Sequence, residues 1–260
     1  MPIHYGKEAS IATITLDNPP VNVFTPALHR DFHTILSDFL IDREVRVGIL
    51  TAAGTRAFCA GDDIKTPRPD RSTGEIVIRH LNPKDPKDTP EYPGWEGEIR
   101  RLSEERFKPI IAAVNGPVMG QGLIYLLQLT DLRIATPNAR FGLPEIRYGM
   151  AGASGVVRLG RHLAPTAALW LALTGQSFSA EEALRQSLVN EIVAPGRLLE
   201  RAREIAAIIA SHPPIAVRVE MEAYYRAQDM TREQAAAFTG HLYRLQRAAM
   251  DATVPLAKPR

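Results

Sequence analysis

The chain has 260 residues, of which 45% are hydrophobic and 23% charged, and its formal net charge is +2. This composition is typical of a globular protein with one large domain, or one domain and a small helical appendage. Lysine and arginine are scattered along the chain, which argues against a nucleic-acid or membrane partner and favours a phosphate-bearing small molecule.

Strand-like and helix-like stretches alternate along the first part of the chain. Thr25 followed by Pro26 is a helix start with proline at the first helical position. Apolar residues then recur at helical spacing, at Leu28, Phe32, Ile35, Leu36 and Phe39. Strand patterns occupy residues 11–16, 45–51, 109–114, 131–136 and 188–193. Strands separated by helices predict a layered α/β domain.

The last part of the chain is helix-like. Ser179 with Glu182 and Thr231 with Gln234 have the spacing of capping boxes. Three helices are predicted, over residues 198–211, 213–228 and 231–250. We therefore divide the chain into an α/β core, residues 1–195, and a C-terminal helical region for oligomer contacts, residues 196–260.

A proline-rich insertion covers residues 66–97. Taken alone, such a segment is as typical of a linker as of a functional loop. It falls between two predicted strands of one sheet, where a long excursion is usually a functional loop or lid.

Three glycine-rich segments follow strands: AFCAGDDI (57–64), NGPVMGQGL (115–123) and ARFGLPEIRYGMAGASG (139–155). Strand ends that lead into helix starts aim free N–H groups at one place, so the three together indicate an anion-binding site. The sequence lacks GxxxxGK(S/T) and a GxGxxG after a strand, which argues against nucleotide and dinucleotide loops.

In order and approximate spacing, these segments resemble the enoyl-CoA hydratase/isomerase (crotonase) superfamily. The resemblance rests on AFCAGDDI, PIIAAVNGPVMGQG, DLRIA, FGLPE and LWLALTGQSFSAEEALRQSLVNEIV, and it covers residues 10–225. It implies an α/β fold in which ββα units form a spiral, with C-terminal helices used for trimer contacts. It also implies an acyl-CoA substrate, no separate cofactor, and a homotrimer or a hexamer that is a dimer of trimers.

The same resemblance places an oxyanion hole on the backbone N–H groups of Asp62 and Gln121. Two fixed donors bind a thioester enolate better than the parent carbonyl, and losing one typically costs about 10²–10³ in rate. By resemblance, Ala60, Asp62 and Ile64 shape the adenine pocket of CoA. Substrate contacts are expected at two further positions, Gly120 and Ile124.

The resemblance gives Glu145 the role of general acid/base, and Ile124 stands where hydratases of the family carry a second glutamate. Because isoleucine cannot transfer a proton, paired-carboxylate hydration is in doubt. One carboxylate suffices to move a proton along a three-carbon unit, so we expect a double-bond isomerase. Two alternatives stay open: a hydratase or C–C bond hydrolase with a second acid/base from the insertion, and a catalytically degenerate acyl-CoA-binding protein.

Other reactive side chains have simpler interpretations. His29 and His33, four residues apart, lack a third ligand and are expected on a solvated helix face; Asp62 and Asp63 lack a further carboxylate. We therefore predict no metal site. Cys59, the single cysteine, is expected to be buried, and it excludes an intramolecular disulfide. With no signal-peptide pattern and no apolar run of the ~20 residues needed to cross a bilayer, a cytoplasmic location is expected.

Overall fold

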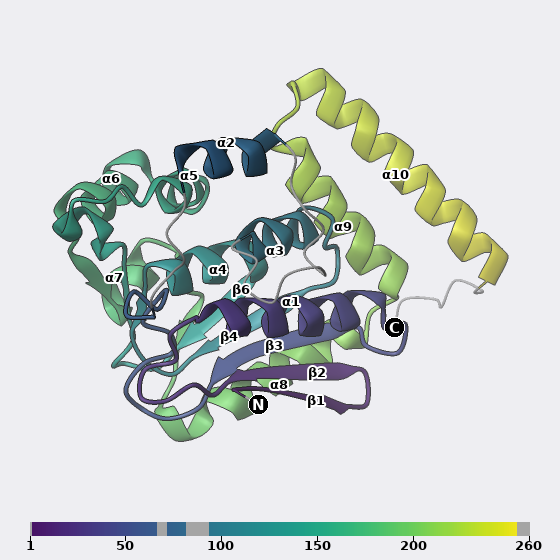
Figure 1. The fold of residues 1–260 in the computed structure, drawn as a ribbon. Coiled ribbons are helices and arrows are strands. Elements are labelled where there is room, and N and C mark those ends of the chain that lie inside the picture. The colour runs from purple at the N-terminus through teal and green to yellow at the C-terminus, as the bar shows by residue number, and fades with distance from the viewer. Residues whose placement is uncertain (1, 67–71, 82–93, 254–260) are drawn as a thin grey trace.

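The computed structural model describes residues 2–66, 72–81 and 94–253. A six-stranded sheet forms the centre, in the order β1-β2-β3-β4-β6-β9 (Figure 1). The first pair is antiparallel and all other neighbours are parallel. The strands are β1 (Ile3–Glu8), β2 (Ile11–Leu16), β3 (Val47–Ala52), β4 (Ile110–Val114), β6 (Leu132–Ala135) and β9 (Glu191–Ile192).

A smaller sheet in the order β5-β7-β8 accompanies the main one. In it β5 (Val118–Met119) is parallel to β7 (Arg140–Gly142), which is antiparallel to β8 (Ser177–Ser179). β5 follows β4 after a short turn and leads directly into α4 (Gln121–Leu129). This compact strand–turn–strand–helix unit carries one of the glycine-rich segments predicted to form the site.

Helices cover both faces of the main sheet. α8 (Leu198–Ala210) packs small residues, including Ala202 and Ala206, against Val47 and Ile49 of β3 and their neighbours. α1 (Pro26–Ile41) and α4 pack on the opposite face in the larger core cluster (Figure 1). Alternation along the strands assigns successive side chains to the two faces, as expected for a sheet buried on both sides.

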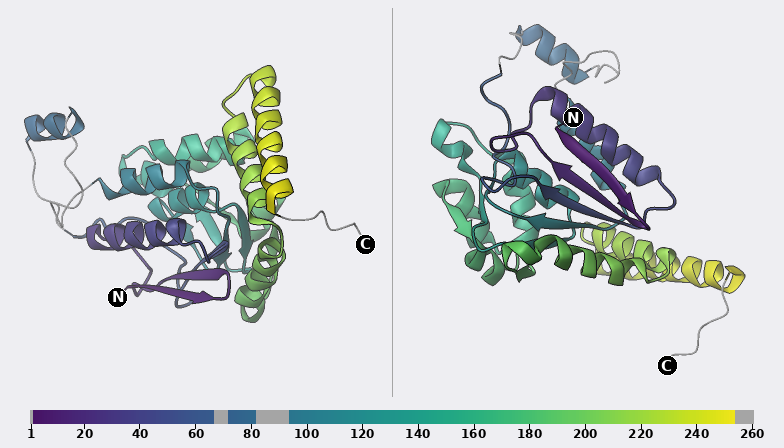
Figure 2. Two further views of the ribbon diagram at one scale, coloured as in Figure 1. Left: turned by 90° about the vertical axis from the view of Figure 1, so that its right-hand side faces the viewer. Right: turned by 90° about the horizontal axis from the view of Figure 1, so that it is seen from below.

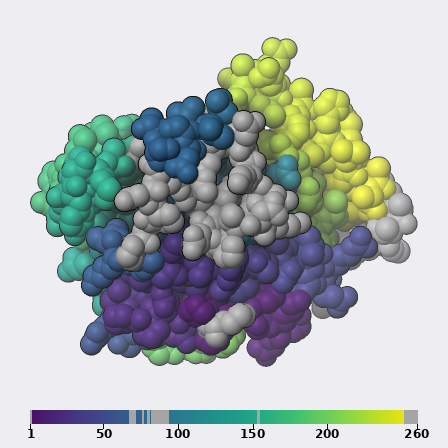
Figure 3. Space-filling model, in the orientation of Figure 1, coloured from purple at the N-terminus to yellow at the C-terminus, as the bar shows by residue number. Residues whose placement is uncertain are grey.

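Further helices surround this core (Figures 1 and 2). α9 (Pro214–Ala227) and α10 (Arg232–Thr253) run beside each other and form a hairpin at one side of the molecule, and α10 is a ridge in the space-filling view (Figure 3). The helices not yet named are α2 (Thr73–Leu81), α3 (Trp95–Glu104), η2 (Pro144–Tyr148), α5 (Ala153–His162), α6 (Pro165–Thr174), α7 (Ala180–Arg185) and η3 (Pro195–Arg197). Within the described ranges, none of the helices has the length and apolar character of a bilayer span.

The elements predicted from periodicity are confirmed. Thr25 caps α1 by accepting a hydrogen bond from the N–H of Leu28, and the five apolar residues predicted for its inner face are all buried. Both capping boxes are formed, at Ser179 with Glu182 and at Thr231 with Gln234. The last predicted strand is shorter than expected, because only residues 191 and 192 pair with β6. In its described part the insertion contains α2 and the start of α3, so it is not a simple linker.

Candidate active site

Two glycine-rich segments run side by side at the edge of the core. The N–H of Phe58 donates to the carbonyl of Pro117 at 2.9 Å, and the N–H of Met119 donates to the carbonyl of Cys59 at 2.9 Å. These bonds form a parallel bridge between Cys59 and Val118. Continued by three residues on each chain, this register brings Asp62 beside Gln121.

The N–H of Asp62 points away from its neighbour on the other side, the strand-like segment at Phe24. The two chains form a bridge in which Phe24 donates to the carbonyl of Gly61 and Asp63 donates to the carbonyl of Phe24, both at 2.8 Å. Successive N–H groups alternate in direction along an extended segment. The N–H of Asp62 is therefore directed away from Phe24.

The N–H of Gln121 lies at the first position of α4, where amide groups have no acceptor within the helix. The two segments approach closely, because a Cβ built on Gly61 would lie 3.5 Å from the nitrogen of Gln121. Gly61 has φ +103° and Gly120 has φ +55°, both in the region that favours glycine. The N–H of Gln121, at the start of a helix, thus lies on a segment next to the loop that carries Asp62.

The carboxylate of Glu145 lies beside this pair. A Cβ built on Gly120, the residue that precedes Gln121, would be 2.9 Å from Oε1 of Glu145. The side chain is half-buried, and its Oε2 atom is buried with no hydrogen-bond partner in the described part of the chain. Burial raises the pKa of Glu145 because desolvation disfavours the charged form. A carboxylate in this state is suited to accept and return a proton.

An apolar wall stands next to Glu145. Leu143 and Glu145 both border Gly152, and Leu143 and Ile124 both border Gly155. Ile124 and Leu143 are 8% and 2% exposed, so they belong to the core. Ile124 stands where hydratases of the family are expected to carry a second glutamate, so this wall offers no acid or base at that position.

The residues predicted to bind CoA lie on the outer side of the same loop. Ala60 is exposed, and Ile64 is 75% exposed, which is unusual for a large apolar side chain. A flat apolar ring such as adenine would cover such a surface. Trp95, from the insertion, is buried against the ring of His33.

Cys59 is fully buried, as predicted, and burial raises the pKa of its thiol to about 12. A Cβ built on Gly122 would be 2.7 Å from its Sγ atom, so this thiol is a packing residue at the base of α4.

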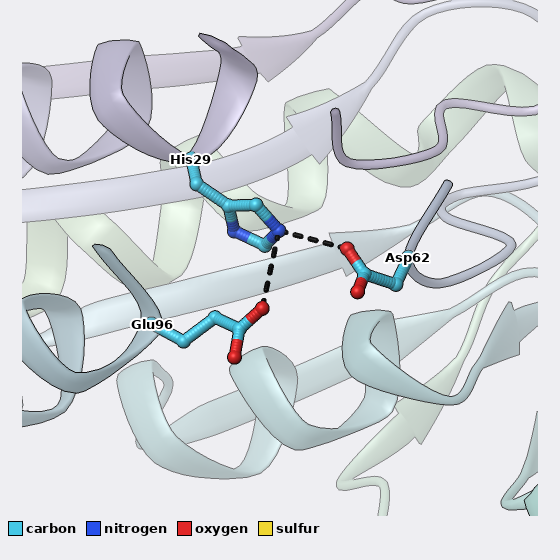
Figure 4. A group of neighbouring side chains, drawn as sticks. All are labelled: His29, Asp62 and Glu96. Atoms are coloured by element: carbon cyan, nitrogen blue, oxygen red, sulfur yellow. Dashed lines mark hydrogen bonds and ion pairs between the residues drawn. The ribbon is translucent and has the colours of Figure 1, made fainter. Parts of the chain in front are cut away.

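The prediction of a solvated His29 is wrong. Its side chain is buried, and its Nε2 lies 2.9 Å from Oδ1 of Asp62 and 3.6 Å from Oε1 of Glu96 (Figure 4). Its Nδ1 lies 2.7 Å from the hydroxyl of Tyr125. The reason is that α1 turns this residue toward the apolar face, where Phe24 stacks on the imidazole.

A third ligand group, the carboxylate of Glu96, does lie near His29 and Asp62, contrary to the sequence interpretation. His29, Asp62 and Glu96 each offer one ligand atom, and these atoms lie within 4.8 Å of one another. Three such groups could hold a divalent cation. The same 2.9 Å contact is equally the length of a hydrogen bond from Nε2–H to a carboxylate, so a proton and a metal ion are alternatives at one position.

Sequence reasoning missed Tyr125 and Glu96 as members of this cluster. Tyr125 lies four residues after Gln121, one helical turn further along α4, but this spacing alone does not connect it with His29 on another helix. Glu96 lies in the first turn of α3, at the end of the proline-rich insertion, and no local pattern distinguishes it from other glutamates.

The mixed α/β core, its C-terminal helices and the glycine-rich loops beside a half-buried carboxylate agree with the fold of the crotonase superfamily. The family model "Enoyl-CoA hydratase/isomerase" matches residues 6–251, and the chain belongs to this family. It is 34% identical to (E)-benzylidenesuccinyl-CoA hydratase of Thauera aromatica over 254 residues, covering 96% of this chain and 93% of that protein.

Two further similarities agree with this assignment. The chain is 34% identical to carnitinyl-CoA dehydratase of Escherichia coli (strain K12), covering 90% of this chain and 84% of that protein. An enoyl-CoA hydratase structure from Bacillus anthracis superposes with a TM-score of 0.80 at 32% identity, over 94% of this chain and 90% of that one. The predicted crotonase fold is confirmed.

Proposed function

We propose that the protein isomerises the double bond of an enoyl-CoA thioester, with Glu145 as the single shuttling base. The observation that carries this proposal is the pairing of a half-buried carboxylate at Gly120 with an apolar wall made by Ile124 and Leu143. Such a wall offers no second group to activate water, but it does not hinder transfer of one proton along the acyl chain.

The reaction begins when Glu145 removes a proton from Cα of a β,γ-enoyl thioester. The electron pair enters the conjugated system, and the thioester oxygen becomes an enolate oxygen that accepts hydrogen bonds from the N–H groups of Asp62 and Gln121. Glu145, now protonated, returns the proton at Cγ, and the double bond ends between Cα and Cβ. The enzyme is unchanged, and neither water nor a redox group is consumed.

The CoA part of the substrate is assigned to the outer loop. The exposed apolar side chain of Ile64 and the open position at Ala60 support an adenine contact there. The acyl group is assigned to the side of Gly120 and Ile124, because this is where Glu145 can reach the carbons next to the thioester.

Glu145→Gln tests the proposal. General acid/base groups contribute about 10²–10⁴ in rate, so we expect kcat for a β,γ-enoyl-CoA to fall on that scale with an unchanged melting temperature. Isomerisation by the wild type without hydration of an α,β-enoyl-CoA would support the shuttle. Near-wild-type turnover by the variant would refute it, and acyl-CoA binding without turnover of either substrate would favour a degenerate binding protein.

Reversible hydration is the second candidate, supported by the names of the two relatives and by Glu96. This residue comes from the insertion, its side chain is 41% exposed, and it lies in the same cluster as Asp62. If Glu96 supplies the second acid/base, then Glu96→Gln should abolish hydration and leave isomerisation of the β,γ-substrate intact.

We also propose that the active protein is a trimer or a dimer of trimers. α9 and α10 stand out from the body and expose Tyr224, Tyr243 and Leu245, each about three-fifths accessible or more. Exposed apolar side chains on a projecting hairpin are typical of subunit contacts.

A further inference from the structure

The two segments assigned to the oxyanion hole are also connected through side chains. Tyr125 lies one helical turn after Gln121 on α4, and its hydroxyl lies 2.7 Å from Nδ1 of His29. Nε2 of His29 lies 2.9 Å from Oδ1 of Asp62. Two buried side chains therefore connect the loop at Asp62 with α4, the helix that begins at Gln121.

The direction of these bonds follows from their donors and acceptors. Burial raises the pKa of Tyr125 well above its ordinary value, so its hydroxyl keeps its proton. The carboxylate of Asp62 can only accept, so Nε2 of His29 carries a proton and donates it. In the tautomer with its proton on Nε2, Nδ1 of His29 accepts from the O–H of Tyr125.

The connection is held rigidly by aromatic packing. Phe24 lies 5.1 Å from the ring of His29 and 5.0 Å from that of Tyr125, measured between centroids. The backbone of Phe24 is the strand partner of Asp62. His29 and Tyr125 are 4% and 2% exposed, so water does not compete for these bonds. One aromatic unit thus joins α1, α4 and the loop at Asp62.

We propose that His29 and Tyr125 are positioning residues that fix the spacing and direction of the two oxyanion donors. The donors lie on separate segments, and the bridge between these segments at Cys59 and Val118 ends before either donor is reached. The contact of Asp62 with His29 fixes the carboxylate of Asp62 against α1. The inference rests on the proposed oxyanion hole, and it holds for isomerisation and hydration alike.

Tyr125→Phe is the main test, because it removes one hydroxyl and keeps the ring that packs on Phe24. His29→Ala removes the imidazole that contacts both Tyr125 and Asp62, and His29→Gln restores a donor toward Asp62. His33→Gln is the matched control, since His33 lies one turn further along α1 and contacts Trp95 with tilted rings. For each variant we would measure kcat, KM, the melting temperature and the absorbance shift of bound cinnamoyl-CoA, which reports polarisation of the thioester carbonyl.

Displacement of a reacting group by about 1 Å can cost about 10²-fold. We expect kcat to fall about tenfold in Tyr125→Phe and up to about 10²-fold in His29→Ala, with KM changed less than about twofold. The red shift of bound cinnamoyl-CoA should shrink in both, recover in part in His29→Gln, and stay at the wild-type value in His33→Gln.

Glu145→Gln separates this inference from the proposed function. It should lose turnover yet keep the full red shift, because the donors are untouched. If Glu145→Gln loses turnover while Tyr125→Phe keeps both the wild-type kcat and the red shift, the positioning role is refuted and the function stands. If Glu145→Gln keeps turnover, the proposed function itself fails. Should His29→Ala not fold, Tyr125→Phe decides.

Discussion

At the scale of single residues, the proposed role of Glu145 links its environment to the pH range of activity. In the proposed shuttle the carboxyl must be ionised to take the first proton, and burial raises its pKa above the ordinary value for glutamate. We therefore predict that kcat/KM falls on the acid side as pH drops through this raised pKa, with about a tenfold loss per pH unit below it.

The measurement is kcat/KM for a β,γ-enoyl-CoA against pH. The apparent pKa of the acid limb should lie above that of a solvent-exposed glutamate. An acid limb at or below the ordinary glutamate value would contradict the assigned desolvation. Glu182→Gln is the control, because this carboxylate closes the capping box at Ser179, away from the site. Its pH profile should match that of the wild type.

The sequence reveals the main-chain donors more readily than their supports. Asp62, Gln121 and Glu145 lie in AFCAGDDI, NGPVMGQGL and FGLPE, the segments that carry the resemblance, so they could be named from it. His29, Tyr125 and Glu96 could not, because their contacts join residues 29, 62, 96 and 125, which lie on different elements. Only the packing of α1, α3 and α4 brings them together.

At the scale of elements, a buried charged cluster attaches α9 to the core. Asp131 accepts two hydrogen bonds from Arg106 at 2.8 Å, one from the N–H of Ile110 at 2.7 Å and one from the hydroxyl of Tyr225 at 2.5 Å. Burial by itself would raise the pKa of Asp131, but the charge of Arg106 and these hydrogen bonds outweigh it and lower the pKa.

We predict that Asp131→Asn lowers the free energy of unfolding by about 3–5 kcal/mol at neutral pH, because it leaves the buried Arg106 without its counter-charge. Denaturant unfolding measures the loss. The exposed pair Arg161–Asp229 is the matched control, and Asp229→Asn should change the free energy by less than about 1 kcal/mol.

The contribution of Asp131 to the free energy of unfolding depends on pH. A depressed pKa means that ionised Asp131 contributes its full stability above the ordinary aspartate pKa of 3.8 and loses it as pH falls through the lower, folded-state pKa. The stability difference between wild type and Asp131→Asn should therefore narrow in strong acid. A constant difference down to pH 2 would contradict this account.

Elements defined by local signals were predictable, whereas those defined by pairing were not. α1 and α10 have caps and helical periodicity within their own sequences. β1 buries only Ile3 fully and lies at the edge of the sheet, so its alternation is weak. β5, β7 and β8 have three residues or fewer, too few for a recognisable alternation, and they are strands only through their pairing with one another.

At the scale of the whole molecule, the projecting α9–α10 hairpin leads to a prediction about assembly. If this hairpin forms the proposed subunit contacts, sedimentation of the 28.7 kDa chain should give a mass of three or six copies. Leu245→Asp, on α10, should shift the distribution toward monomer by burying a charge in the contact.

Ile41→Asp is the matched control, because Ile41 is 77% exposed but lies at the end of α1, outside the hairpin. It should sediment as the wild type does. A monomeric wild type, or a Leu245→Asp variant that keeps the wild-type mass, would contradict a role for α10 in assembly.

The donors at positions 62 and 121 are peptide groups, and this has a consequence for how such enzymes diverge. A substitution cannot delete a peptide N–H, except by proline, so a change of side chain at position 62 or 121 keeps both proposed donors. Such a change can alter only where the donors lie, for example by removing the contact between Asp62 and His29. Variants at these positions should therefore lose rate gradually, whereas a proline there should remove a donor outright.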